Sequence, residues 1–154
     1  MFQHAEAALT ELMVLLARAD DEFTRILANE LEFTKRAKTT DVMFARFIDL
    51  QRKPDTAAKT DFHKLMVELL SLAERRNDIV HSKYTPWTNI EGAHGLVREN
   101  SKLKASKGLR DVESEDLLPE AFQSDFDRLY ASLVALEAFR LKCINWVYSS
   151  DADA

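Results

Sequence analysis

Glycine, proline and cysteine are scarce in this chain, which contains three glycines, three prolines and one cysteine among its 154 residues. All-β sandwiches and barrels need a turn about every 8–12 residues, and such turns use glycine and proline. Six residues of these two types cannot supply the turns, so the composition predicts a mostly helical protein. The single cysteine, Cys143, excludes an internal disulfide framework and a metal site built from several cysteines.

Long hydrophobic runs are also missing. No apolar run approaches the roughly 18 residues that a membrane-spanning helix needs, and the first residues lack the basic and apolar regions of a secretory signal. The hydrophobic fraction of 46% is typical of a folded globule. We therefore expect a cytoplasmic protein without a membrane partner, with a single helical domain over residues 1–150 and a disordered tail over 151–154.

Charge is unevenly distributed along the chain, although the net charge is only −5. Residues 34–110 carry 16 basic and 9 acidic side chains, whereas residues 1–33 and 111–154 are both strongly acidic. The negative net charge argues against the class of nucleic-acid-binding proteins whose whole surface is basic. The basic middle indicates either a local site for an anionic ligand or a solvated face that complements the acidic ends.

Apolar residues recur at steps of three and four along most of the chain, which is the period of an amphipathic helix. The first helix is expected over residues 3–36, with an irregularity at 20–22. A cap at 39–41 is expected to begin the second helix, and Pro54 stops it. These helices belong to a predicted all-α fold, an antiparallel bundle of four to five helices.

Two further helices complete the predicted bundle and are separated by an insertion. Asp55 caps a helix that runs to about Val80, and Pro119 opens the last long helix. The insertion, over about 82–118, holds all three glycines and lacks helical periodicity. A structureless segment of this length is unusual in a compact domain, so we expect a short β-hairpin, with strands at 95–98 and 108–112, or a mobile flap.

Most catalytic signatures are absent from the sequence. There is no phosphate-binding loop, no dinucleotide-binding glycine motif, no serine-hydrolase elbow and no H-E-x-x-H zinc motif. Glu91 and His94 form one E-x-x-H pair, but a di-iron bundle needs two such pairs on facing helices and two further glutamates. We therefore expect no metal site and no cofactor.

Polar residues interrupt the apolar seam of the helix that follows Asp55. After Leu72, the next inward positions are Arg76 and Asn77. A guanidinium directed at a bundle seam must be paired or must face a polar pocket. Asn77 and His81 are four residues apart and share one helix face. Arg75 has a similar spacing to His81, so the sequence leaves open which arginine belongs to the site.

The stretch Arg76-Asn77-Asp78-Ile79-Val80-His81 resembles the R-x(4–6)-H motif of the HEPN superfamily, the higher eukaryote and prokaryote nucleotide-binding domains. The resemblance implies a helical bundle that forms a homodimer and acts as a metal-independent endoribonuclease. It also implies a place in a toxin–antitoxin or phage-defence system, with RNA as substrate and an antitoxin protein as partner. The alternatives are a non-catalytic dimeric interaction or nucleotide-binding domain, and a helical scaffold in which the motif affects folding only.

Metal-free RNA cleavage assigns a role to each residue of the motif. The substrate's 2′-hydroxyl attacks the adjacent phosphate, which requires a group that exchanges protons near neutral pH and a fixed positive charge. His81 is the predicted acid–base catalyst, Arg76 stabilises the phosphate, and Asn77 orients either His81 or the phosphate. The residues predicted to contact the RNA backbone or bases are Lys83, Tyr84, Arg98, Lys102, Lys104 and Lys107.

Overall fold

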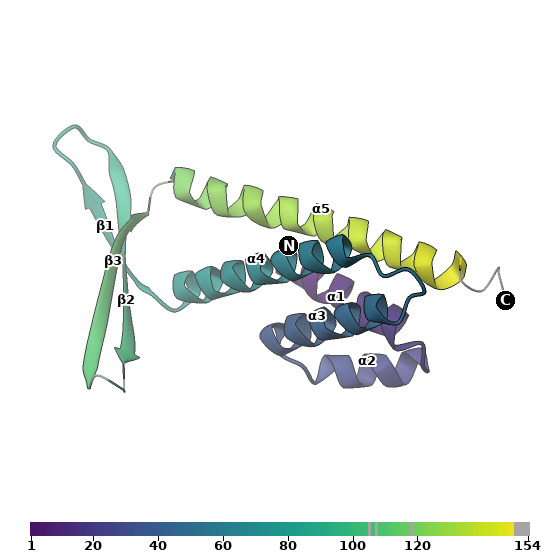
Figure 1. Ribbon diagram of the computed structural model, residues 1–154. Coiled ribbons are helices and arrows are strands. Elements are labelled where there is room, and N and C mark those ends of the chain that lie inside the picture. Colours follow the sequence, from purple (N-terminus) through teal and green to yellow (C-terminus); the bar gives the residue numbers. More distant parts are fainter. Residues whose placement is uncertain (105, 107, 118, 150–154) are drawn as a thin grey trace. The chain divides into compact units, whose positions relative to one another are not determined.

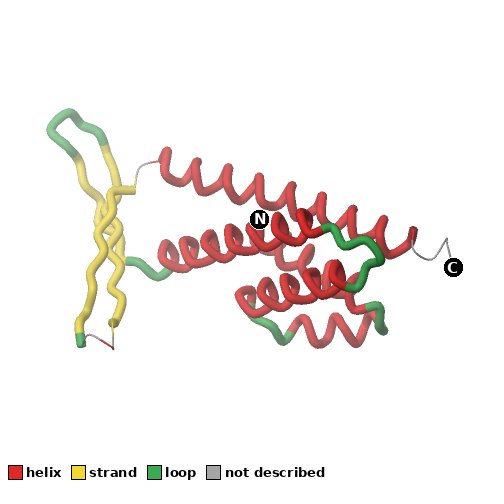
Figure 2. The backbone as a smooth tube through the Cα atoms, in the orientation of Figure 1, coloured by secondary structure: helices red, strands yellow, loops and turns green. Residues whose placement is uncertain are grey.

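The computed structural model describes residues 1–104, 106, 108–117 and 119–149 (Figures 1 and 2). The chain divides into two compact units, one of residues 1–73 with 129–154 and one of residues 74–128. The expected tail at 151–154 lies outside the described residues. The described helices are α1 (Phe2–Ala17), α2 (Asp21–Asn29), α3 (Phe33–Asp49), α4 (Thr56–Val80) and α5 (Pro119–Ser149).

Apolar stripes from α1, α3, α4 and α5 form the core of the first unit. Phe44 and Phe62 are fully buried and their rings stack with centroids 4.1 Å apart. Phe139 of α5 meets both rings edge-on, at 5.6 and 5.2 Å. Aromatic pairs in these two arrangements add stability beyond the area that they bury. The packing therefore confirms the helical periodicity on which the predicted bundle rests.

The helix expected over residues 3–36 is wrong as a single helix, whereas the irregularity expected at 20–22 is confirmed as the start of α2. Arg18 has a φ of 49°, in the left-handed region that ends a helix, and it terminates α1. Two residues later Asp20 caps α2 by accepting a hydrogen bond from the backbone N–H of Phe23, at 2.8 Å. Two local backbone features thus break a stripe whose periodicity is continuous in sequence.

The cap predicted at 39–41 is also wrong, because these residues lie inside α3. The Thr40 hydroxyl donates to the carbonyl of Arg36 at 2.8 Å, four residues earlier in the same helix. A threonine that bonds this carbonyl is satisfied within a helix and need not cap one. By contrast, Asp55 accepts from the N–H of Ala58 at 2.9 Å, and α4 begins at Thr56 as predicted.

The second unit contains a three-stranded antiparallel sheet, so the all-α prediction is wrong and the fold mixes helices with a sheet (Figure 2). The strands are β1 (Lys83–Thr88), β2 (His94–Lys104) and β3 (Leu109–Leu117), in the order β1-β2-β3. The predicted hairpin corresponds to β2 and β3, which are longer than expected. The missed strand β1 contains Pro86, which an edge strand tolerates because its unpaired side needs no N–H donor.

None of the helices in the described residues has the length and apolar character needed to cross a membrane.

Candidate functional site

The candidate site lies at the C-terminal end of α4, within the second unit. The buried seam of this helix ends with Leu72 and Ala73. Arg76 and Asn77, which the helical period places next on the seam, are exposed instead. Arg76 and Asn77 therefore lie beyond the buried seam of α4, where a charged side chain keeps its hydration and its desolvation cost is small.

Arg75 is held by two carboxylates. Its Nη1 and Nη2 donate to the two carboxylate oxygens of Glu115 at 2.6 and 2.8 Å, and its Nε donates to Asp125 at 3.1 Å. This forked geometry matches a planar guanidinium to a carboxylate. Arg75, with lesser contributions from Arg98, lowers the pKa of Glu115 below the ordinary value of 4.5, and the same contacts raise the pKa of Arg75. Each of the three guanidinium nitrogens of Arg75 therefore donates to a carboxylate.

Arg98 completes the network from the middle strand. It is only 4% exposed, its Nε donates to Glu115 at 3.0 Å, and its Nη1 donates to the Ser82 hydroxyl at 3.2 Å. A buried guanidinium needs such partners because its desolvation is costly. Arg98, which the sequence predicted to contact RNA, is therefore a buried member of an ion network formed by Arg75, Arg98, Glu115 and Asp125.

Short polar contacts fix β1 and β2 against the end of α4. The Tyr84 hydroxyl donates to the carbonyl of Ile79, and the Ser82 hydroxyl donates to the carbonyl of Asp78. Asn100 of β2 donates to the Asp78 carboxylate at 3.2 Å. The last carbonyls of a helix have no partner within it, and the two hydroxyl groups supply hydrogen-bond donors to two of them. Tyr84 is consequently half-buried and is held by its hydroxyl.

The three residues predicted to be catalytic lie at the end of α4, with His81 directly after its last residue, Val80. Arg76 Nη1 donates to the side-chain oxygen of Asn77 at 3.2 Å, and the backbone N–H of His81 donates to the carbonyl of Asn77 at 3.0 Å. The side chains of Arg76, Asn77 and His81 are all exposed. The structure thus distinguishes the two arginines, because Arg75 is occupied by carboxylates and Arg76 is open to solvent beside Asn77.

The predicted RNA-contacting residues are placed unevenly. Lys83 is exposed on β1, where it pairs in register with Glu99. Lys102 and Lys104 lie on β2, where they pair in register with Asp111 and Leu109. The side chains of both lysines lie outside the described part of the structure. Lys107 lies outside the described residues altogether.

Trp87 lies against the backbone of the neighbouring strand. Its register partner is Gly95, where an added Cβ would lie 2.6 Å from the indole ring. Gly95 therefore allows the close approach that a larger residue would prevent. The indole Nε1 is buried without a hydrogen-bond partner among the described residues. Trp87 therefore packs on the sheet at Gly95.

Candidate metal ligands are dispersed in the described residues, where no group of three or more His, Cys, Asp or Glu side chains could hold a metal ion. His94 uses its Nδ1 in a 2.9 Å hydrogen bond with the Thr88 hydroxyl.

Burial raises the pKa of the Cys143 thiol to about 12, so this cysteine remains protonated at neutral pH.

Glu115 and Asp125 are the functional-site residues that sequence reasoning missed. They are 40 and 50 positions away from Arg75. One signal was available for Glu115, since it pairs in register with Arg98 once β2 and β3 are aligned. Opposite charges at paired positions stabilise a sheet.

Comparisons with protein-family models, curated proteins and solved structures find no match to this chain.

Proposed function

We propose that the protein is a metal-independent endoribonuclease of HEPN type that works as a homodimer. The observation that carries the proposal is the difference in environment between the two adjacent arginines. Arg75 is tied to Glu115 and Asp125, whereas Arg76 is exposed and contacts Asn77, and His81 is exposed directly after the end of the same helix. An exposed imidazole and a guanidinium are the two groups that metal-free RNA cleavage needs.

The chemistry follows from the substrate's own hydroxyl group. His81 accepts the proton of the RNA 2′-hydroxyl as this oxygen attacks the adjacent phosphorus, and the P–O5′ bond breaks. The 5′-oxygen takes up a proton, from His81 in its protonated form or from the matching His81 of the second copy. Arg76 stabilises the negative charge that develops on the phosphoryl oxygens. Asn77 positions Arg76 through the contact described above, and exposed Lys83 binds the RNA backbone.

Cleavage by the wild-type protein should persist in excess EDTA and leave 2′,3′-cyclic phosphate ends. The reason is that the nucleophile is the ribose hydroxyl and the charges come from side chains, so no step needs a divalent ion. The measurement is gel analysis of a 5′-labelled RNA, with end-group mapping of the fragments.

Two results would contradict this prediction. Cleavage that stops in EDTA and returns with Mg²⁺ or Mn²⁺ would point to metal-assisted chemistry. RNA that is bound but left intact by the purified dimer would favour the alternative of a non-catalytic interaction or nucleotide-binding domain.

A further inference from the structure

Helix α2 presents its large apolar side chains to solvent. Phe23, Ile26 and Leu27 are 66%, 55% and 57% exposed, while the small residues Thr24 and Ala28 are buried. The spacing of three and four places the exposed residues on one face. Amphipathic helices normally bury their apolar stripe, and α2 buries the opposite face. A contiguous exposed apolar face is typical of an interaction site.

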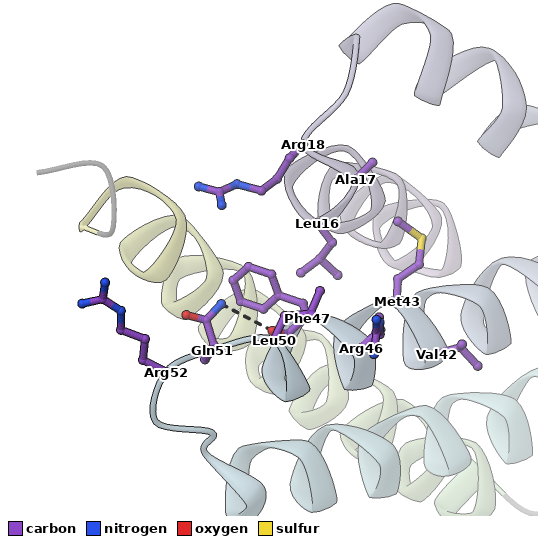
Figure 3. A pocket seen from close by; sticks show the side chains of 10 residues that line it. All are labelled: Leu16, Ala17, Arg18, Val42, Met43, Arg46, Phe47, Leu50, Gln51 and Arg52. Carbon is purple, nitrogen blue, oxygen red and sulfur yellow. Dashed lines mark hydrogen bonds between the residues drawn. The ribbon is translucent and has the colours of Figure 1, made fainter. Parts of the chain in front are cut away.

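A basic groove lies in the same unit (Figure 3). Its volume is about 830 Å³, and it is formed by the end of α1 and one face of α3. Figure 3 shows Leu16 and Phe47, both buried, with Arg18 above and Arg52 below. The residues that line it are Leu16, Ala17, Arg18, Val42, Met43, Arg46, Phe47, Leu50, Gln51 and Arg52, and none of these is acidic.

The charges around the groove and around α2 are opposite. Arg46 and Arg52 at the groove are exposed, and exposed Val42 and Leu50 extend its apolar surface along α3. Opposite charges arranged across an apolar contact favour association and fix its register.

Two exposed glutamates border the apolar face: Glu22 of α2, four residues before Ile26, and Glu30, which directly follows α2 and lies seven residues after Phe23. The one arginine of α2, Arg25, is turned to Glu11 of α1, with which it forms a 2.7 Å ion pair. The outward side of α2 is therefore apolar and acidic.

We propose that α2 of one copy docks into the basic groove of a second copy, and that the second copy returns the same contact. Phe23 to Glu30 spans about 10 Å of helix, and Val42 to Leu50 spans about 12 Å, so the two surfaces match in length. Arg18 lines the groove and lies two residues before Asp20, the cap of α2, so the groove and the helix both belong to the first unit. A two-fold contact requires each copy to offer both complementary surfaces, as this chain does. The contact is an amphipathic helix in an apolar groove.

This inference specifies the interface of the homodimer in the proposed function and is independent of RNA cleavage. The test uses two charge-reversal proteins, Arg46→Glu with Arg52→Glu, and Glu22→Lys with Glu30→Lys. Each alone places like charges across both contacts and should raise the dimer dissociation constant roughly 100-fold. An equimolar mixture should restore a dimer, because every contact then joins opposite charges. Sedimentation equilibrium at micromolar concentration measures all three samples.

A matched control changes exposed apolar residues outside the groove and α2. Val134→Lys with Leu141→Glu on α5 keeps the net charge, and this protein should dimerise like the wild type. Ile26→Ala, which alters no charge, should also weaken the dimer. Two charge-reversal proteins that remain dimeric, or a mixture that stays monomeric, would overturn the assigned interface alone. A monomeric wild type would overturn both this interface and the proposed homodimer, whatever its ribonuclease activity.

Discussion

Arg76→Ala should reduce RNA cleavage by roughly 10²–10³-fold, the usual loss when one preorganised donor to a developing oxyanion is removed. Its melting temperature should remain close to that of the wild type, because Arg76 is exposed and contacts only the neighbouring Asn77 side chain among the described hydrogen bonds. Cleavage of a short labelled RNA under single-turnover conditions, together with thermal denaturation, measures both effects.

The control for Arg76→Ala is Arg110→Ala, which removes another exposed arginine of the second unit. This variant should cleave RNA within a few-fold of the wild-type rate. If Arg76→Ala and Arg110→Ala cleave equally well, the guanidinium at position 76 has no part in the reaction, and the assignment that separates Arg76 from Arg75 fails.

Glu115→Ala should lower the free energy of unfolding by about 3 kcal/mol, at the lower end of the cost of breaking a buried ion pair. The variant leaves the buried guanidinium of Arg98 without its carboxylate, while Arg75 retains Asp125. The Glu115 side chain is itself one-third exposed, which moderates the loss. Urea denaturation followed by circular dichroism measures the difference.

Glu137→Ala is the control for Glu115→Ala, because Glu137 and Arg140 form an ion pair on the surface of α5, at 2.7 Å. Such a pair contributes up to about 1 kcal/mol.

The pKa of Glu115 is lowered on folding, so the stabilisation of the fold by its carboxylate is present above pH 4.5 and is lost as the pH falls through the folded pKa. The gap between wild type and Glu115→Ala should therefore shrink in acid. Equal losses for Glu115→Ala and Glu137→Ala would contradict the network's role.

The sequence predicts the long helices well because their signals are local. The apolar stripe of α4 and its Asp55 cap lie within a few residues of one another. The division of the first predicted helix depends instead on the left-handed backbone of Arg18, a conformation that periodicity does not report. Strand β1 was missed because its pairing partners, such as Gly95 for Trp87, are supplied by another segment of the chain.

For the candidate site, the sequence supplies the residue types but not their partners. The sequence predicts that Arg76 and Asn77 follow the apolar seam of this helix, and the structure places both near the end of α4 and His81 directly after it. The choice between the two arginines depends on Glu115 and Asp125, which reach Arg75 only through the tertiary fold. Burial of Arg98 likewise follows from strand pairing, so a basic residue in a basic segment need not be exposed.

The most direct test of the central claim is the cleavage rate of His81→Ala on a defined RNA, measured together with RNA binding. The control is His63→Ala, which changes an exposed histidine of α4. The account predicts that His81→Ala lowers the cleavage rate by roughly 10²–10⁴-fold while RNA affinity and melting temperature stay unchanged, and that His63→Ala cleaves normally. Wild-type cleavage by a folded His81→Ala protein would contradict the account.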